Sequence, residues 1–273
     1  MKPPTAHLTT PDGTRIAYRD HTPPDGRSGR TVLLLHGLAG HMGEWEDLTA
    51  RLLADGHRVV TYDARGHGVS TRTPADMTRA AAVSDATALI DHLHLAPVTL
   101  VGQSLGGLTA LLVAASRHAP AVDSLVLVEA GPACRDPELP SRIGAWLDSW
   151  PPVFRTRTEA LEFLGHEAWV RGLDEREDGW YPTLDRDTMV AAVAELATHD
   201  YWAEWSLITC PTLVVRGENG TMRESEAREM RTRRPSTATT VVQDAAHDVH
   251  LDQPEALYET IARFLVRSWK SAH

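Results

Sequence analysis

The ten residues 98–107, which read VTLVGQSLGG, decide the fold of this chain. The first four form a short apolar, β-branched run typical of a strand buried on both faces of a parallel sheet. The spacing Gly102-x-Ser104-x-Gly106 follows at once, and a helical pattern comes after it. In that setting the glycines permit a sharp turn that holds the serine at its tip, beside the N-terminal N–H groups of the helix. The stretch therefore predicts that Ser104 is a nucleophile, rather than part of a tight turn without chemistry.

The same alternation of buried strands and helices continues on both sides of this turn. Residues 5–20 predict two short strands joined by a turn at Pro11-Asp12-Gly13. Further strands are expected at 31–35, 58–63, 125–128, 212–215 and 239–243, and helices at 44–54, 77–95, 105–117 and 254–270. Strands that alternate with helices imply a parallel sheet covered by helices on both faces.

One stretch interrupts this alternation. Between Gly131 and Ser206 no buried strand is evident, and helical patterns occur at 157–171 and 186–201. This stretch holds six of the eight tryptophans, namely Trp146, Trp150, Trp169, Trp180, Trp202 and Trp205. We interpret it as a helical insertion over the sheet. Alternatively, these are ordinary surface helices whose tryptophans pack onto the core, and both interpretations can be partly true.

Composition and charge narrow the class of protein. The chain has 273 residues, with 27 Lys and Arg against 37 Asp and Glu, which gives a formal net charge of -10. This balance argues against a nucleic-acid or anionic-membrane partner. The partner expected from the motifs described below is a small-molecule substrate. The two cysteines, Cys134 and Cys210, suggest a reducing compartment, and residues 1–10 contain no apolar signal-peptide core. We expect a cytoplasmic protein, and the sequence leaves a homodimer open.

A serine nucleophile needs a base, and His247 is the best candidate among the 14 histidines. It follows the predicted strand 239–243 and precedes the last helix, so it lies at the same sheet edge as Ser104. His250 is the nearby competitor. Two backbone N–H groups can form an oxyanion hole: that of Leu38, in the loop after the first buried strand, and that of Leu105, which follows the nucleophile.

The stretch DARGHGVS, residues 63–70, also follows a strand and is rich in glycine. It matches neither of the two glycine-rich phosphate-binding patterns, so we do not interpret it as a phosphate loop. Asp63 and Arg65 are expected to fix this loop through ion pairs or hydrogen bonds. The side chain of His36 is likewise expected to be structural.

Together these motifs resemble the α/β-hydrolase superfamily. The matching pieces are HGLAG, DARGHGVS, GQSLGG, LVLVEAGP and DAAHDVHLDQPEAL, and the resemblance extends over essentially the whole chain outside the insertion. The resemblance implies a mainly parallel eight-strand sheet flanked by helices, a helical cap and no cofactor or metal. It divides the chain into core (1–131), cap (132–205) and core (206–273). It also implies a catalytic triad in the order serine, acid, histidine.

The acid of that triad departs from the family pattern. Most members carry it as Asp in the loop after the strand that corresponds to 211–215, where this chain has Gly220. Glu129 is the first replacement, because it ends the strand that follows the nucleophile helix, as in branches such as the haloalkane dehalogenases. Glu218 is the second choice, and Asp244 or Asp248 could orient His247 locally. Alternatively, Glu129 is a strand-end carboxylate that only fixes a loop.

These residues predict a cofactor-independent serine hydrolase that cleaves a carboxylic ester or lactone. Ser104 would be the nucleophile, His247 the base and Glu129 the acid. The tryptophan-rich insertion suggests a bulky apolar substrate, bound by Trp146, Trp150, Trp169, Trp180 and Trp202. Three rivals stay open. The same fold could perform C–C bond hydrolysis or cofactor-free oxygenation, or it could bind a small molecule without turnover. The third rival is a purely structural or interaction role.

Overall fold

The computed structural model describes residues 3–23, 26–27 and 29–272. Met1, Lys2 and His273, which the predicted core parts include, lie outside the described residues.

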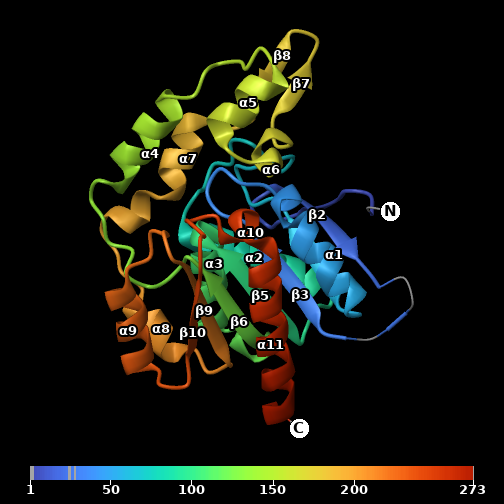
Figure 1. Ribbon diagram of the computed structural model, residues 1–273, viewed down its shortest axis with the longest axis vertical. Coiled ribbons are helices and arrows are strands. Elements are labelled where there is room, and N and C mark those ends of the chain that lie inside the picture. Colours follow the sequence, from blue (N-terminus) through green and yellow to red (C-terminus); the bar gives the residue numbers. More distant parts are fainter. Residues whose placement is uncertain (1–2, 24–25, 28, 273) are drawn as a thin grey trace.

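Eight strands form one sheet in the order β1-β2-β4-β3-β5-β6-β9-β10 (Figure 1). The strands β1 and β2 are antiparallel to their neighbours, whereas the remaining six pair in parallel. The prediction of a mainly parallel eight-strand sheet is therefore confirmed. The strands are β1 (Ala6–Thr9), β2 (Arg15–His21), β3 (Thr31–Leu35), β4 (Arg58–Tyr62), β5 (Val98–Gln103), β6 (Val122–Val128), β9 (Thr212–Gly217) and β10 (Ala238–Val242).

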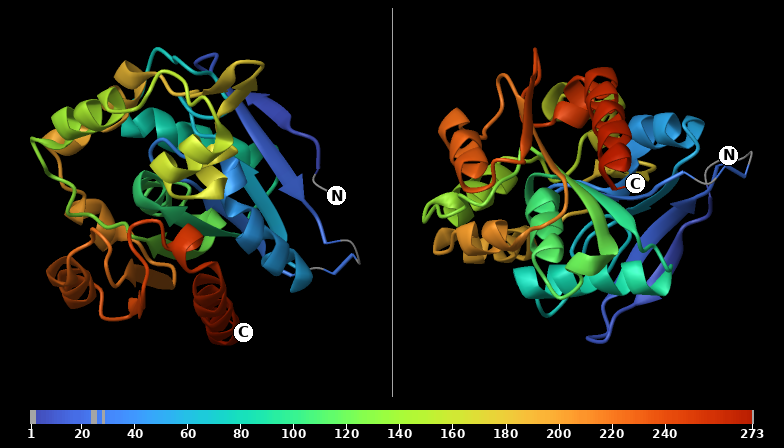
Figure 2. Two further views of the ribbon diagram at one scale, coloured as in Figure 1. Left: turned by 45° about the horizontal axis from the view of Figure 1, so that its top comes forward. Right: turned by 90° about the horizontal axis from the view of Figure 1, so that it is seen from below.

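Helices cover both faces of this sheet (Figure 2). Because strand side chains alternate between the two faces, Leu33 and Leu35 join one core cluster while Val32 and Leu34 join the other. The first cluster includes side chains of α2, α3, α8 and α9, and the second includes side chains of α1 and α11. These helices are α1 (Glu46–Ala54), α2 (Arg79–His92), α3 (Ser104–Ala114), α8 (Trp202–Leu207), α9 (Glu224–Arg233) and α11 (Pro254–Ala272). Short helical turns are η1 (Met42–Trp45), η2 (Ala119–Ala121) and α10 (Val249–Asp252).

The segment that interrupts the alternation lies mostly above the carboxyl ends of the parallel strands (Figure 1). It contains α4 (Leu139–Asp148), α5 (Arg157–Leu164), α6 (Glu167–Val170), α7 (Arg186–Ala192), η3 (Ala194–Ala197) and the strand pair β7 (Asp174–Arg176) and β8 (Gly179–Tyr181). Its last helix, α8, differs from the rest because Trp205 is fully buried in the sheet core and donates its indole N–H to the carbonyl of Met230. The boundaries of a cap domain stay a prediction.

Two details of this segment differ from the sequence expectation. The helix predicted over 157–171 is broken at Gly165, whose φ of 80° belongs to the left-handed region and ends α5. The helix predicted over 186–201 ends at Ala192 and continues as the turn η3. The two-strand ribbon β7–β8 was not predicted, because each strand is only three residues long and β7 is exposed.

Candidate active site

The turn between β5 and α3 places Ser104 at the carboxyl edge of the sheet. Its φ is 50°, a left-handed conformation that is uncommon for a residue other than glycine. A Cβ added at Gly102 would lie 2.5 Å from the carbonyl oxygen of Gly106, and one added at Gly106 would lie 2.3 Å from that of His36. Both positions therefore require glycine, because the helix passes directly against the strand and its neighbour.

His247 lies in the loop between β10 and α10 and contacts two side chains through Nδ1. That nitrogen lies 2.9 Å from Oγ1 of Thr221 and 3.4 Å from Oε2 of Glu129. Ser104, His247 and Glu129 line the same cavity of about 510 Å³. The structure thus brings together the three side chains that the sequence singled out for a triad.

Glu129 follows β6 and is held from several directions. Its φ is 49° and its side chain is fully buried. Oε1 accepts the N–H of Gly217 at 2.8 Å, while Oε2 accepts those of Thr221 at 2.6 Å and Met222 at 3.0 Å. Burial by itself would raise the pKa of this carboxyl, but the nearby His247 and the hydrogen bonds from backbone N–H groups outweigh burial and lower the pKa. Glu129 is therefore ionised at neutral pH beside the imidazole.

The carboxylate of Glu129 fills the space that a side chain at position 220 would need. A Cβ built on Gly220 would lie 2.2 Å from Oε1 of Glu129 and 2.5 Å from Oε2. The position of the Glu129 carboxylate therefore requires glycine at position 220. Glu218 instead accepts the backbone N–H of Asp244 at 3.1 Å and is exposed.

The other acids and the competing histidine have partners of their own. His250 is buried and contacts Glu44, with 3.2 Å between Nε2 and Oε2. Asp248 accepts the side-chain amide of Gln103 at 3.2 Å, and the same amide donates to the carbonyl of His247. Asp248 and Gln103 therefore brace the backbone of the His247 loop.

The loops expected to hold the oxyanion meet the cavity. Leu38 and Leu105 both line it. The N–H of Leu105 lies in the first turn of α3, where backbone amides have no acceptor within the helix. Both residues therefore lie at the cavity that contains Ser104.

Two buried histidines fix the loop that contains Leu38. His36 Nε2 accepts the N–H of Ala64 at 3.0 Å, and His67 Nε2 accepts the N–H of Ala39 at 3.1 Å. Burial lowers the pKa of His36 to about 4 and that of His67 to about 3, so both rings are neutral acceptors at neutral pH. His36 is thus structural, as the sequence predicted.

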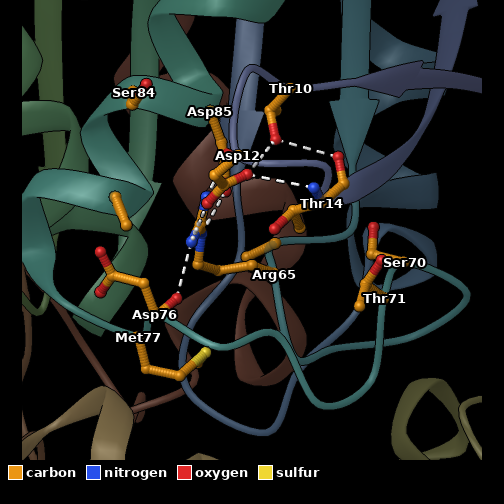
Figure 3. Close-up of polar contacts among 12 residues, drawn as sticks. Thr10, Asp12, Thr14, Arg65, Ser70, Thr71, Asp76, Met77, Ser84 and Asp85 are labelled. Atoms are coloured by element: carbon orange, nitrogen blue, oxygen red, sulfur yellow. Dashed lines mark hydrogen bonds and ion pairs between the residues drawn. The ribbon is translucent and has the colours of Figure 1, made fainter.

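The stretch 63–70 is fixed by the charged residues that the sequence indicated. Arg65 lies between Asp85 and Asp12 (Figure 3). Its guanidinium nitrogens lie 2.6 Å from both carboxylate oxygens of Asp85 and 3.0 Å from an oxygen of Asp12. Asp63 accepts the N–H groups of Met42 at 2.7 Å and Val69 at 2.9 Å. These contacts hold residues 63–70 in place.

The tryptophans of the insertion separate into distinct groups. Trp146 and Trp169 line the cavity above Ser104. Trp150 packs edge-on against Trp146, with 5.4 Å between ring centroids. Trp180 pairs with Phe154 through its backbone, and Trp202 lies 4.2 Å under the guanidinium of Arg233. Of the five tryptophans expected at the substrate, the structure therefore places two in the lining of this cavity and gives Trp150, Trp180 and Trp202 other contacts.

Thr221 and Gln103 belong to the site but were not predicted from the sequence. Gln103 stands inside the serine motif, where its contact with the histidine loop depends on the fold. Thr221 directly follows Gly220, the position at which most family members carry the acid. Its hydroxyl next to that position was the sequence signal that could have indicated a role in the site.

Two general properties complete the description. No helix in the described part of the chain is long and apolar enough to cross a membrane. Among residues 3–23, 26–27 and 29–272, no group of three or more His, Cys, Asp or Glu side chains is arranged to hold a metal ion.

Comparison with known proteins shows the family to which this chain belongs. The sequence profile of the alpha/beta hydrolase family matches residues 32–260. The chain is 31% identical to the sn-1-specific diacylglycerol lipase ABHD11 of Mus musculus, over 86% of this chain and 80% of the lipase. It is 34% identical to the putative carbamate hydrolase RutD of Variovorax paradoxus, over 73% of this chain and 76% of that protein. This protein belongs to the alpha/beta hydrolase family.

A solved structure agrees with this assignment at the level of fold. The crystal structure of E-2-(acetamidomethylene)succinate hydrolase superimposes with a TM-score of 0.82 and 23% sequence identity. The match covers 96% of this chain and 99% of that hydrolase.

Proposed function

We propose that this protein is a serine hydrolase that cleaves a carboxylic ester or lactone of a bulky apolar small molecule. The observation that carries the proposal is the buried, ionised Glu129 beside His247, in the cavity that also contains Ser104 at its strained turn. A serine, a histidine and a carboxylate in this order and at one sheet edge are the parts of an acyl-transfer triad.

The residues take the following roles in the proposed reaction. Ser104 attacks the substrate carbonyl while His247 Nε2 accepts its proton. The N–H groups of Leu38 and Leu105 bind the oxyanion, and His247 returns the proton to the leaving alcohol. Water then repeats the sequence on the acyl-enzyme. Throughout, Glu129 stabilises the positive imidazolium, because its low pKa keeps it ionised.

The character of the cavity supports an apolar substrate. Besides Trp146 and Trp169, its lining includes a set of aliphatic and methionine side chains, namely Leu108, Leu139, Ile143, Val193, Leu196 and Met222. Most of the upper wall comes from the segment 132–205, which we propose to be a cap over the site. The volume of about 510 Å³ fits a small molecule.

An activity screen tests the proposal. The protein is assayed against p-nitrophenyl esters of increasing acyl length and against lactones of several ring sizes, with Ser104→Ala as the control. We expect turnover of at least one bulky apolar ester or lactone, and a fall of several orders of magnitude in Ser104→Ala. Wild-type turnover in Ser104→Ala would contradict the mechanism.

Two negative outcomes would favour the rival functions. Labelling of Ser104 by a fluorophosphonate without turnover of any ester or lactone would favour C–C bond hydrolysis or cofactor-free oxygenation. The absence of both labelling and turnover would favour a binding protein.

A further inference from the structure

The hydroxyl of Thr221 stands between the imidazole and the carboxylate of the candidate triad. Its Oγ1 lies 2.9 Å from Nδ1 of His247 and 3.3 Å from Oε2 of Glu129. The direct separation between Nδ1 and Oε2 is 3.4 Å. A charge-assisted hydrogen bond between such groups is normally about 2.7–2.9 Å long. The hydroxyl of Thr221 is therefore the nearer partner of the imidazole.

The donors around Glu129 explain why the imidazole turns to the hydroxyl. Oε2 already accepts two backbone N–H groups, those of Thr221 at 2.6 Å and Met222 at 3.0 Å. Oε1 accepts the N–H of Gly217 at 2.8 Å. Backbone N–H groups at the end of β9 and in the loop after it therefore satisfy most of the hydrogen-bonding capacity of the carboxylate, without any contribution from His247.

Proton accounting gives each group a definite role. In the resting enzyme Nε2 of His247 must be free to accept the proton of Ser104, so Nδ1 carries the ring hydrogen. That N–H donates to Oγ1 of Thr221, and the hydroxyl hydrogen of Thr221 donates to Oε2 of Glu129. Each donor in this series of hydrogen bonds has an acceptor. Oε2 of the charged carboxylate lies 3.4 Å from Nδ1 of the imidazole.

We propose that Thr221 is a positioning residue of the hydrolase: its hydroxyl fixes the His247 ring for proton transfer and connects it to Glu129. This inference rests on the proposed function. The hydroxyl is suited to the task because the backbone N–H of the same residue is bonded to the same carboxylate. Thr221 and Glu129 therefore form one unit against which the ring is held.

Solvent access makes such a fixed partner necessary. The side chain of His247 is 36% exposed, whereas that of Glu129 is fully buried. Without the hydroxyl, Nδ1 would exchange its hydrogen bond with water, and the ring would spend part of its time turned away from Ser104. The effect belongs to the chemical step, so it changes kcat and leaves substrate binding alone.

Three variants test this role. Thr221→Val keeps the shape and removes the hydroxyl, Thr221→Ser keeps the hydroxyl, and Thr232→Val is the matched control. Within the described part of the chain, the hydroxyl of Thr232 bonds only to the carbonyl of Arg228 on the exposed side of α9. For each variant, kcat, KM and the pH profile of kcat/KM are measured on one ester, together with the rate of labelling by a fluorophosphonate.

We expect Thr221→Val to lower kcat and the labelling rate by about 10- to 100-fold, the range for a lost hydrogen bond to a charged group, with KM within about twofold. The acid limb of the profile should move to lower pH, because the imidazolium loses an acceptor. Thr221→Ser should recover to within about threefold, and Thr232→Val should match the wild type.

Two outcomes overturn the role of Thr221. The first is an unchanged kcat and acid limb in Thr221→Val, and the second is a Thr221→Ser variant as impaired as Thr221→Val. Both are distinguishable from failure of the proposed function, because Ser104→Ala is inactive when only the role of Thr221 is wrong. Turnover by Ser104→Ala would remove the function itself.

Discussion

The loop after β6 and the loop after β9 lie side by side at the carboxyl edge of the sheet, since these strands pair in parallel. The first supplies a carboxylate, Glu129, on a backbone with positive φ. The second supplies no acid toward the site. It provides the N–H groups of Thr221 and Met222, next to that of Gly217 at the end of β9, and its Gly220 leaves room for the carboxylate of Glu129. On the proposed assignment, the place of a triad acid in space is separable from its place in the sequence.

The largest expected effect comes from removing the charge that the first loop supplies. Glu129→Gln keeps the shape but turns an N–H₂ group toward backbone donors and leaves the imidazolium without compensation. We expect kcat on the reference ester to fall by about 10³- to 10⁴-fold, the size typical of losing a triad acid. Steady-state kinetics, with circular dichroism to verify folding, make the measurement. A fall in kcat of less than tenfold would show that the loop after β6 does not supply the acid.

The next effect comes from filling the space in the second loop. In Gly220→Ala the new Cβ would lie 2.2 Å from Oε1 of Glu129, so the carboxylate must move. Because displacement of a catalytic group by about 1 Å can cost about 10²-fold, we expect a loss of kcat of that order. The measurement is kcat together with the melting temperature.

Gly144→Ala is the matched control for this substitution. There the added Cβ would lie 2.6 Å from Nη2 of Arg186, the far end of an exposed side chain that can move. Equal activity of the two alanine variants would show that the space at Gly220 is not reserved for Glu129.

A smaller effect concerns stability and pH. The pKa of Glu129 is lower in the folded protein than its ordinary value of 4.5, despite burial. Ionised Glu129 therefore stabilises the fold above that value, and this contribution is lost as the pH falls through the lower folded pKa. The difference in unfolding free energy between wild type and Glu129→Gln should shrink between pH 7 and pH 3, by at most about 1.4 kcal/mol per pH unit.

Urea denaturation at several pH values measures this difference, and the comparison of two variants cancels the titration of other carboxylates. A difference that grows as the pH falls would mean that Glu129 is protonated in the fold, and the assignment of an ionised acid would fail.

The smallest effect is expected at the acid of the second loop. Glu218 is exposed and accepts only the N–H of Asp244 among its described contacts. Glu218→Gln should therefore stay within about twofold of wild-type kcat, as surface changes away from a site do. Parallel kinetics with Glu129→Gln make the measurement. A crippled Glu218→Gln would move the acid back to the loop after β9.

Much of this arrangement follows from the sequence because its signals are local. The buried apolar runs predict the parallel strands, and the spacing Gly-x-Ser-x-Gly predicts the turn at Ser104. The glycine at 220 directs attention to Glu129, because strands adjacent in sequence are commonly neighbours in the sheet. The first two of these inferences need only one strand and its own loop, and the third needs only the adjacency of neighbouring strands.

The remaining features depend on contacts between distant segments. Thr221 lies 26 positions from His247 and 92 from Glu129, and its hydroxyl acquires a role only when three loops meet. The six tryptophans look alike in the sequence, yet Trp205 packs into the sheet core while Trp146 lines the cavity. Short helices interrupted by residues such as Gly165 do not specify which of their faces turns toward the site.

The measurement that tests the central claim most directly is the rate at which a fluorophosphonate modifies Ser104, with the adduct mapped by peptide mass spectrometry. Wild type and Glu218→Gln should be labelled at Ser104 at equal rates, whereas Glu129→Gln should react at least about 10²-fold more slowly, because His247 is no longer held as an effective base. An adduct that is absent from Ser104, or a Glu129→Gln variant labelled at the wild-type rate, would contradict a Ser104 nucleophile activated through His247 and Glu129.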